Sequence, residues 1–507
     1  MTYKYIKTAL AIGLLFLVCS CRKDIGNYDY QEINKVKFAG IDSAYFGLLG
    51  ERFQINPKLD FTLDPAGNEA DYSYEWIALN MGSSVLPKDQ KNDLAKTRNL
   101  DIVLKVPPGP YKVYYTVTDK KTGVAYTRMF RLNVETSIYE GWMVLNEVNG
   151  AARLDMISKI KDVYLPVADI LGTTGSELVL QGKPVDVYCY PYSRTVYGVY
   201  VSTDQRTDRV DPETFKWKNT FNIKYEMVSN VPDNFHADFI SGIIEENANS
   251  YMFANGNVYY NFATYQISYG TPINLLKGET APFKAAPFVP AARDPKTLSA
   301  TAVLFDTVKK RFVKHSNNES NCNPMLKQDN AFFDYNNVGM DLVYMDYSVF
   351  GGGDVFAVLK DPSGKIYLTK FNMFSGIQNY FSEMTGPDIA NADKFAISPV
   401  YGYLFYSAGG KVYEFDTSLK TTKLMLDKGA EQISLMKFQP FRNTGNSRPY
   451  YQSRRNQLLI GSYNPALPAG KNGKMELYVV PGLNAALTLG ESYEGFGKIV
   501  SISYRER

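Results

Sequence analysis

The sequence predicts an all-β chain in which an N-terminal β-sandwich is followed by a β-propeller with seven blades. The composition favours strands, because the 507 residues include 39 Tyr and 29 Phe and aromatic residues are enriched in β-sheets. Few stretches have the apolar spacing of an amphipathic helix. After residue 136, pairs of short strands recur at intervals of roughly fifty residues, which is near the length of a four-stranded propeller blade.

The first 20 residues have the pattern of a lipoprotein signal peptide. Two lysines precede an apolar run over residues 9–18, and Ser20 provides the small residue that the signal peptidase needs before Cys21. We therefore expect residues 1–20 to be removed, Cys21 to be lipidated and residues 21–34 to form a polar tether. The alternative is a plain signal peptide that leaves Cys21 as a free thiol. No later segment approaches the length of a membrane-spanning helix, so the lipid is the expected membrane anchor.

Bulk composition narrows the classes of function. Removing the signal, which holds two lysines and no acids, lowers the formal net charge from +3 to +1, and a near-neutral chain gives no electrostatic case for nucleic-acid binding. The mature length exceeds what one hydrophobic core usually serves, so we expect at least two domains. Beyond Cys21 only Cys189 and Cys322 remain, which favours two buried thiols over one disulfide. His236 and His315 lack a second histidine at metal-ligand spacing.

Residues 35–136 are predicted to form the sandwich. Residues 71–79 alternate so that Tyr72, Tyr74 and Trp76 share one face, as in a half-buried strand. Trp76 is therefore expected in the core of the domain.

A hairpin is predicted near the end of this domain. Residues 108–110 (Pro-Gly-Pro) form a turn into a strand over 111–119, and residues 125–134 form the returning strand. In this order, the Tyr-x-Trp strand, the Pro-Gly-x-Tyr turn and the Val-Thr-Asp ending resemble the PKD-type immunoglobulin-like sandwich. The Gly-Asp-Gly turn common in that family is replaced by residues 80–83 (Asn-Met-Gly-Ser). We expect the domain to act as a spacer rather than as a binding module.

Residues 137–507 are predicted to form the propeller. Each repeat combines an apolar strand, a short turn and a second strand of alternating polarity. The final strand, residues 498–504, is expected to complete the blade opened by Trp142 and so close the ring. The alternative is a pair of irregular sandwiches, because the repeats diverge in sequence. The seven strand pairs are 142–145 with 153–156, 196–201 with 207–210, 251–254 with 257–260, 301–305 with 311–314, 355–359 with 365–368, 403–406 with 411–415, and 458–461 with 475–479.

Two loop motifs contain reactive residue types without the context that their chemistry requires. Residues 351–354 (Gly-Gly-Gly-Asp) are not followed by Lys-Ser or Lys-Thr, so a flexible inter-strand loop is favoured over a phosphate loop. Asp204, Asp208 and Asp211 lack the spacing, central glycine and terminal glutamate of a calcium loop. A solvated turn is therefore favoured over a metal site, and we expect neither a metal nor a cofactor.

Two acidic pairs, Glu245 with Glu246 and Asp341 with Asp346, offer the two carboxylates that a glycosidase needs. Acidic residues are common in loops, and the chain has no Gly-x-Ser-x-Gly nucleophile elbow. We therefore assign no catalytic residues and expect a protein that is not an enzyme. A hydrolase or lyase is the alternative.

Aromatic residues in three polar loops are the candidate ligand-binding residues. Aromatic faces beside amide and carboxylate groups can stack on a sugar ring and hydrogen-bond its hydroxyls. The alternative is ordinary packing between blades, because aromatic residues abound in this chain. The candidates are Phe332, Phe333 and Tyr335 in residues 329–337, Tyr450 and Tyr451 in residues 448–456, and Trp217 in residues 214–218.

The whole chain resembles the PKD-like family lipoproteins of Bacteroidota. The resemblance rests on the lipoprotein signal, the opening Asp-Ile-Gly-Asn-Tyr-Asp-Tyr of residues 24–30, the PKD-type domain and the long β-rich remainder. It implies an accessory lipoprotein that captures or presents a polymer, glycan or peptide, beside a SusC-like TonB-dependent transporter and a SusD-like lipoprotein. The alternative is a structural subunit that binds only this transporter pair. Residues 22–24 (Arg-Lys-Asp) hold one acid, so a periplasm-facing lipoprotein is the alternative to display at the outer surface.

Overall fold

The computed structural model describes residues 32–82, 90–160, 163–190, 198–243, 249–263, 267–316, 319–442 and 448–507. The chain divides into two compact units, Met1–Thr136 and Ser137–Arg507. Across the described ranges both units are built from strands, and the α-helices are short: α2 (Ile170–Thr174) and α3 (Pro449–Arg454). No helix among the described residues is long and apolar enough to cross a membrane. The predicted signal, Cys21, and the pair Glu245 and Glu246 lie outside the described residues.

The first unit is a β-sandwich with one core. A five-stranded sheet of order β2-β9-β8-β5-β6 packs against two two-stranded sheets, β1-β4 and β3-β7. The core contains Phe53 and Leu100 from the small sheets and Phe130 from the large one. The strands of the large sheet are β2 (Ala44–Leu48), β5 (Tyr72–Asn80), β6 (Lys91–Ala95), β8 (Gly109–Asp119) and β9 (Ala125–Glu135), and those of the small sheets are β1 (Val36–Ala39), β4 (Lys58–Phe61), β3 (Arg52–Ile55) and β7 (Leu100–Val103).

Trp76 lies at the centre of this core. Tyr72, Tyr74 and Trp76 on β5 are all buried, as their alternation predicts. The indole ring stacks on Tyr115 with ring centroids 3.9 Å apart, and its Nε1 donates a hydrogen bond of 2.8 Å to the carbonyl of Thr97. The polar edge of the indole is therefore satisfied inside an apolar core.

The predicted hairpin is present, but the prediction of a turn at residues 108–110 is wrong. β8 and β9 pair in antiparallel register, and the Asp119 carboxylate accepts from the backbone N–H groups of Lys121 and Thr122 at 2.8 and 3.2 Å, which closes the loop. Gly109 is already part of β8 and pairs with Val134 on β9. Gly109 and Pro110 join the sheet because β9 extends far enough to pair with them.

The second unit contains seven antiparallel sheets among its described residues, numbered here in chain order. All seven predicted strand pairs are confirmed as antiparallel ladders, except that residues 196 and 197 of the second pair lie outside the described residues. Sheet 1 is β10 (Glu140–Val148), β11 (Ala151–Ile160), β12 (Val163–Val167) and β35 (Lys498–Arg505); sheet 2 is β13 (Pro184–Cys189), β14 (Val199–Thr203) and β15 (Thr207–Val210); and sheet 3 is β16 (Phe239–Gly242), β17 (Ser250–Ala254) and β18 (Asn257–Asn261). Sheet 4 is β19 (Ala291–Arg293), β20 (Ala300–Asp306), β21 (Arg311–Ser316) and β22 (Asn323–Pro324), and sheet 5 is β23 (Asp341–Ser348), β24 (Asp354–Lys360), β25 (Ile366–Asn372) and β26 (Gln378–Glu383). Sheet 6 is β27 (Lys394–Ile397), β28 (Leu404–Ala408), β29 (Lys411–Asp416) and β30 (Thr421–Asp427), and sheet 7 is β31 (Gln432–Phe438), β32 (Gln457–Tyr463), β33 (Gly473–Val479) and β34 (Thr488–Phe496).

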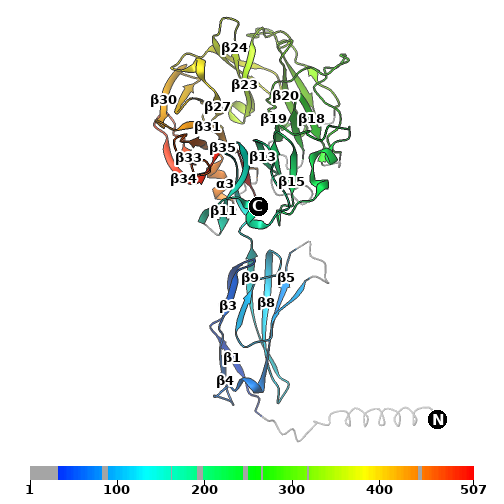
Figure 1. The fold of residues 1–507 in the computed structure, drawn as a ribbon, viewed down its shortest axis with the longest axis vertical. Coiled ribbons are helices and arrows are strands. Elements are labelled where there is room, and N and C mark those ends of the chain that lie inside the picture. The colour runs from blue at the N-terminus through cyan, green and yellow to red at the C-terminus, as the bar shows by residue number, and fades with distance from the viewer. Residues whose placement is uncertain are drawn as a thin grey trace, which may run out of the picture. The chain divides into compact units, whose positions relative to one another are not determined.

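The last strand of the chain completes the first sheet. β35 pairs with β10, so that Trp142 lies opposite Tyr504 and Val144 opposite Ile502, which confirms that the C-terminal strand completes the sheet opened by Trp142. β13 contacts both β35 and β16, and β31 contacts both β27 and β35. The sheets therefore succeed one another around a common centre (Figure 1).

Apolar clusters fill the spaces between neighbouring sheets. On β10, Met143 and Leu145 pack toward sheet 2, whereas Trp142 and Val144 pack toward sheet 7. Comparable clusters join sheets 2 and 3, 3 and 4, 4 and 5, 5 and 6, and 6 and 7. Because successive strand side chains point to opposite faces and both faces are covered, the central strands are continuously apolar in sequence. Cys189 and Cys322 are buried, free thiols in two different clusters.

Candidate functional site

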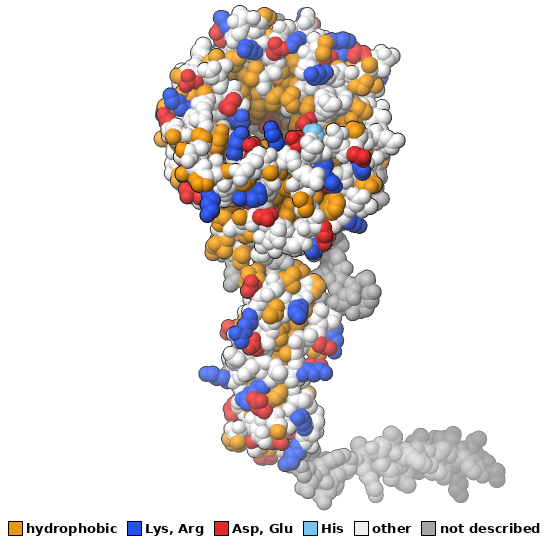
Figure 2. Space-filling view, viewed as in Figure 1, with side chains coloured by type: hydrophobic (Ala, Val, Ile, Leu, Met, Phe, Trp, Pro, Cys, Tyr) orange, Lys and Arg blue, Asp and Glu red, His pale blue; other side chains and the backbone are white. Residues whose placement is uncertain are grey.

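A cavity of about 400 Å³ lies where six of the seven sheets meet. Its lining comes from β13, β16, β23, β27 and β31, together with Ser503 of β35, so six of the seven sheets contribute. Figure 2 shows the viewed face of the second unit hollowed near its centre, with basic and acidic side chains close to the hollow. The side chains that give the cavity its chemistry include Asp186, Tyr188, Tyr344, Asp346, Lys437 and Arg442.

Asp186 on β13 is held by two neighbouring sheets. The Ser501 hydroxyl on β35 donates to Oδ1 at 2.7 Å, and the backbone N–H of Ile240 on β16 donates to Oδ2 at 3.3 Å. Burial raises the pKa of Asp186 despite these hydrogen bonds, which favour the charged form. The carboxyl is therefore fixed in position while remaining costly to ionise.

Asp346 and Lys437 bring opposite charges into the same cavity. Asp346 has an exposed side chain that accepts from its neighbour's backbone at 2.8 Å and from the Tyr344 hydroxyl at 3.2 Å, and partial desolvation by the cavity walls raises its pKa. Burial lowers the pKa of Lys437, while the charges of Asp186 and Asp346 act in the opposite direction. The Lys437 Nζ donates to the Ile502 carbonyl at 2.9 Å, and within the described ranges no carboxylate oxygen lies within 4.0 Å of it. An ammonium and two carboxyls thus converge without forming close ion pairs.

Further polar groups line the cavity without internal partners. The Tyr188 hydroxyl and the Gln439 side-chain carbonyl are buried and accept or donate no hydrogen bond among the described residues. A Cβ at Gly242 would collide with the Tyr188 hydroxyl and the Arg442 guanidinium. Glycine at this position therefore lets both groups reach the cavity wall. Converging polar groups with perturbed pKa values in a concave site are typical of ligand binding.

Sequence reasoning found only part of this site. Asp346 was a candidate carboxylate, but its proposed partner Asp341 pairs with Lys310 instead and does not line the cavity. Asp186 and Lys437 were missed. A charged residue inside an otherwise apolar strand, as in Pro-Val-Asp-Val-Tyr-Cys and Leu-Met-Lys-Phe, is the signal that identifies such positions.

The loop that contains Phe332, Phe333 and Tyr335 exposes one ring. Phe332 is 55% exposed and stacks at 6.3 Å on Phe381. Phe333 is half-buried. Tyr335 is fully buried, and its hydroxyl donates to the Gly376 carbonyl at 2.7 Å. The ligand-binding role of this loop stays a prediction. Of its three aromatic rings, Phe332 is the one exposed for contact with a ligand.

Tyr450 and Tyr451 lie on α3, where sheet 7 meets sheet 1. Tyr451 is 1% exposed, and its hydroxyl donates to Glu140 at 2.8 Å. Tyr450 is half-buried and accepts from the Trp142 indole at 3.1 Å. These contacts give both rings a structural role in the apolar cluster between sheets 7 and 1. A role of Tyr450 and Tyr451 in ligand binding stays a prediction.

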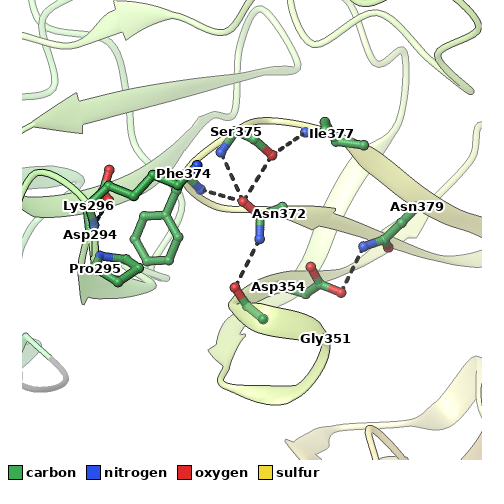
Figure 3. A pocket seen from close by; sticks show the side chains of 11 residues that line it. Asp294, Pro295, Lys296, Gly351, Asp354, Asn372, Phe374, Ser375, Ile377 and Asn379 are labelled. Carbon is green, nitrogen blue, oxygen red and sulfur yellow. Dashed lines mark hydrogen bonds between the residues drawn. The ribbon is translucent and has the colours of Figure 1, made fainter.

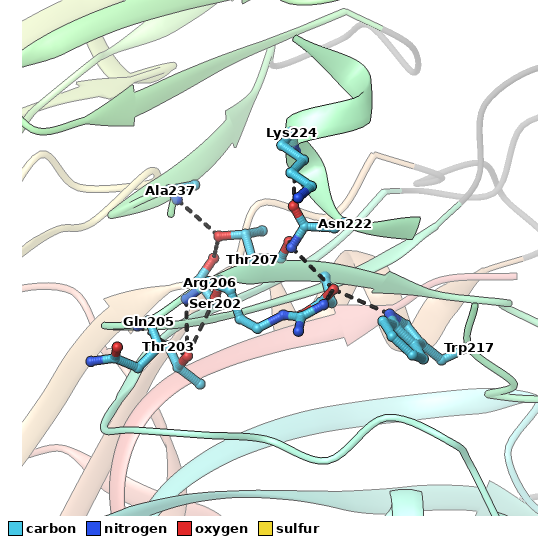
Figure 4. Close-up of polar contacts among 10 residues, drawn as sticks. Ser202, Thr203, Gln205, Arg206, Thr207, Trp217, Asn222, Lys224 and Ala237 are labelled. Atoms are coloured by element: carbon cyan, nitrogen blue, oxygen red, sulfur yellow. Dashed lines mark hydrogen bonds and ion pairs between the residues drawn. The ribbon is translucent and has the colours of Figure 1, made fainter. Parts of the chain in front are cut away.

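Trp217 is tied to a buried aspartate rather than projecting freely. Its Nε1 donates to Asp208 at 3.1 Å, and Asp208 also accepts from Arg206 at 2.5 and 2.7 Å and from the Asn222 amide at 3.3 Å. Figure 4 shows this network around the strand that carries Thr207. The Arg206 guanidinium lies 5.3 Å from the centre of the indole. Trp217 is half-buried, and its role in ligand binding stays a prediction.

The aspartates near Trp217 do not form the solvated turn that the sequence favoured. Asp208 is only 1% exposed and paired with Arg206, because the strand β15 turns it inward. Asp204 accepts from the backbone of Lys183, and Asp211 closes its own turn by accepting from Thr214. Within the part of the chain that the structure describes, no group of three metal-ligating side chains is present.

A family match covers the N-terminal third of the chain. The model of the PKD-like family matches residues 21–184. The PKD-like segment includes the sandwich and continues through β10, β11 and β12 to the first residue of β13. No functionally curated protein matches the chain.

Several solved structures are similar to the chain at low identity. A quinonprotein alcohol dehydrogenase-like protein from Bacteroides thetaiotaomicron is 10% identical, with a TM-score of 0.43 over 93% of this chain and 99% of that one. A protein proposed to be a 6-phosphogluconolactonase, from Bacteroides uniformis, is 11% identical, with a TM-score of 0.40 over 72% and 99%. A DUF4784 family protein from Bacteroides caccae is 8% identical, with a TM-score of 0.32 over 93% and 98%. These values are too low to indicate an activity for this chain.

Proposed function

We propose that the chain is a surface-exposed outer-membrane lipoprotein, anchored through Cys21, that binds a glycan or peptide polymer without cleaving it. In this proposal its PKD-type immunoglobulin-like sandwich is a spacer and its second unit is a seven-bladed β-propeller. It presents the polymer to a SusC-like TonB-dependent transporter and a SusD-like lipoprotein. The signal-like N-terminus and the PKD-like segment support the location, and the apolar cluster between sheets 7 and 1 supports a closed ring.

The central cavity is the observation that carries the binding function. It combines aromatic rings, carboxyls, an amide and basic side chains from six sheets. The Tyr344 ring stacks at 5.3 Å on Phe395, which fixes an aromatic wall beside Asp346. Hydroxyl-rich or zwitterionic end groups of a polymer match this mixture, because each can pair with both donors and acceptors. Loops from several blades around one concavity can add weak contacts along an extended ligand.

Binding assays on cavity variants test this proposal. The mature chain is screened against a panel of polysaccharides and peptides by affinity electrophoresis, and the bound polymer is then measured with Lys437→Met and Asp346→Asn. Removing one charged hydrogen-bonding group should weaken binding by about tenfold or more. Lys471→Met, which changes an exposed lysine of a loop away from the cavity, is the control. A bound polymer whose affinity is unchanged in both cavity variants would refute a role for the cavity.

Two alternatives make different predictions for the same panel. A purely structural subunit would bind no polymer and would still assemble with the transporter pair. A polymer-cleaving enzyme is favoured by one observation, the pair of cavity carboxyls with raised pKa beside a lysine with lowered pKa. New reducing ends or new amines from a matching polymer, lost in Asp186→Asn and Asp346→Asn, would establish the enzyme.

A further inference from the structure

A second pocket, of about 480 Å³, lies between sheets 4 and 5, away from the residues that line the central cavity. Three segments enclose it: residues 294–296 after β19, residues 351–354 at the start of β24, and residues 372–379 between β25 and β26. Figure 3 shows the side chains of these segments facing one another. The pocket contains the glycine run that the sequence suggested to be a flexible loop.

Asp354 is a buried carboxyl with one unused oxygen. It is only 2% exposed. Oδ2 accepts from the Asn379 amide at 2.9 Å, whereas Oδ1 has no hydrogen-bond partner among the described residues. A buried polar atom without a partner costs free energy, so its retention at a pocket wall calls for an external partner. Burial raises the pKa of Asp354, which favours a neutral partner over a cation.

The glycine run and Asn372 hold this carboxyl in place. A Cβ at Gly351 would collide with Asp354, and Gly351, Gly352 and Gly353 all have positive φ, of 71, 81 and 102°. The Asn372 amide donates to the carbonyls of Gly352 and Gly353 at 3.1 and 3.3 Å. The Asn372 side-chain carbonyl also accepts from the backbone N–H groups of Phe374 and Ser375. Asn372 therefore joins the glycine wall of the pocket to the wall formed by residues 372–379. The glycine run is the predicted loop between two strands, β23 and β24, and it forms one wall of the pocket.

Phe374 supplies an aromatic face to the same pocket. Its ring is half-buried and lies against Gly353, where a larger residue would clash, and Figure 3 places it beside Pro295. Lys314 donates to the Phe374 carbonyl at 2.8 Å, which fixes the loop. The pocket thus offers an apolar ring face together with a carboxyl and the exposed amide of Asn379.

We propose that this pocket binds a pyranose ring, with the Phe374 face against its C–H groups and with Asp354 and Asn379 hydrogen-bonded to adjacent hydroxyls. Sugar hydroxyls both donate and accept, which matches an unused carboxyl oxygen and an exposed amide. The other acidic side chain of the lining, Asp294, already accepts from the backbone of Lys296 at 2.8 Å. The described lining holds no third ligand for a metal. This site goes beyond the polymer-binding role proposed for the central cavity and does not depend on it.

Saturation-transfer NMR on the mature chain tests the inference. The probes are the methyl glycosides of glucose, galactose, mannose, N-acetylglucosamine and glucuronic acid. We expect saturation transfer to at least one of them, and we expect Phe374→Ala to weaken its binding about tenfold. Asp354→Asn, which keeps the volume and the acceptor toward Asn379, should weaken it by a similar factor. Phe235→Ala, a half-buried phenylalanine packed at 6.1 Å on Tyr259 in sheet 3, is the matched control.

The two pockets are separated by comparing variants. Lys437→Met alters the central cavity and should leave the glycoside signal unchanged. The inference is overturned if no glycoside receives saturation from the wild-type protein, or if binding survives in both Phe374→Ala and Asp354→Asn. It is also overturned if Lys437→Met abolishes the signal while Phe374→Ala retains it, and that result would leave the polymer-binding proposal intact.

Discussion

Replacing Glu414 by glutamine is expected to stabilise the protein at neutral and alkaline pH. Glu414 lies on β29, is 1% exposed, and has no hydrogen-bond partner on either carboxylate oxygen among the described residues. Burial, with a smaller contribution from Asp416, raises its pKa from the usual 4.5 to about 7, while Lys423 on β30 acts in the opposite direction. Glutamine keeps the shape and removes the charge.

The size of the effect follows from the pKa. Because the folded pKa lies above the unfolded one, the protonated carboxyl contributes stability that is fully present below pH 4.5 and is lost as the pH rises through about 7. Each pKa unit corresponds to about 1.4 kcal/mol, so ionising Glu414 costs up to about 3 kcal/mol in the folded state. Lys423 can move toward the carboxylate and reduce this cost. We therefore expect the free energy of unfolding of Glu414→Gln to exceed that of wild type by about 2 kcal/mol at pH 8.

Urea unfolding followed by circular dichroism at pH 5 and pH 8 measures this difference. The gain of Glu414→Gln over wild type should be small at pH 5 and should grow between the two values. Glu494→Gln, at a side chain 70% exposed and paired with Lys474, should change little at either pH, since surface ion pairs contribute little. If the gain in the free energy of unfolding of Glu414→Gln does not depend on pH, the pKa of Glu414 is not raised, and this prediction is refuted.

Three further predictions test the cores of the two units. Trp76→Ala should lower the free energy of unfolding of the sandwich by about 3 to 5 kcal/mol, and a loss below about 1 kcal/mol in urea titrations would contradict its central place. Burial lowers the pKa of His315 to about 4, although the hydrogen bond between Nε2 and the backbone carbonyl of Glu319 acts in the opposite direction. Since the folded pKa lies below the usual 6.5, the stability should be full above pH 6.5 and fall toward pH 4, and a His315 midpoint near 6.5 in NMR titration would disprove this. Gly141→Ala should lower the melting temperature, because φ is +148° and a Cβ would collide with the Ile157 carbonyl; an unchanged melting temperature would show that this strand can shift.

The strand pairs could be predicted because their signal is local. Alternating apolar residues around a short turn specify a hairpin within about fifteen residues, as in the pair of β28 and β29. Pairing of β35 with β10 also followed from the sequence, since residues 498–504 have the pattern of one more strand after the last repeat. By contrast, Gly109 and Pro110 were predicted as a turn, because the length of their partner strand β9 could not be seen from their own composition.

The site could not be predicted to the same degree, because its residues converge from distant strands. Asp186 and Lys437 are 251 positions apart in the chain, and their meeting depends on how the sheets surround the centre. Burial of Tyr335 and Tyr451 likewise depends on neighbouring sheets, so an aromatic residue in a polar stretch did not reveal which ring faces solvent. Asp354 was not predicted as a site residue either. The glycine run before it does not indicate that Asp354 lines a pocket, because the other lining residues come from distant parts of the chain.

Co-purification from outer membranes of the native host tests the central claim most directly. The chain is tagged at its C-terminus, extracted in mild detergent and captured, and the proteins that accompany it are identified by mass spectrometry. The account predicts a lipidated Cys21 at the mature N-terminus and recovery of a SusC-like transporter with a SusD-like lipoprotein. Recovery of the intact chain from the soluble fraction, or from the outer membrane without either partner, would contradict it.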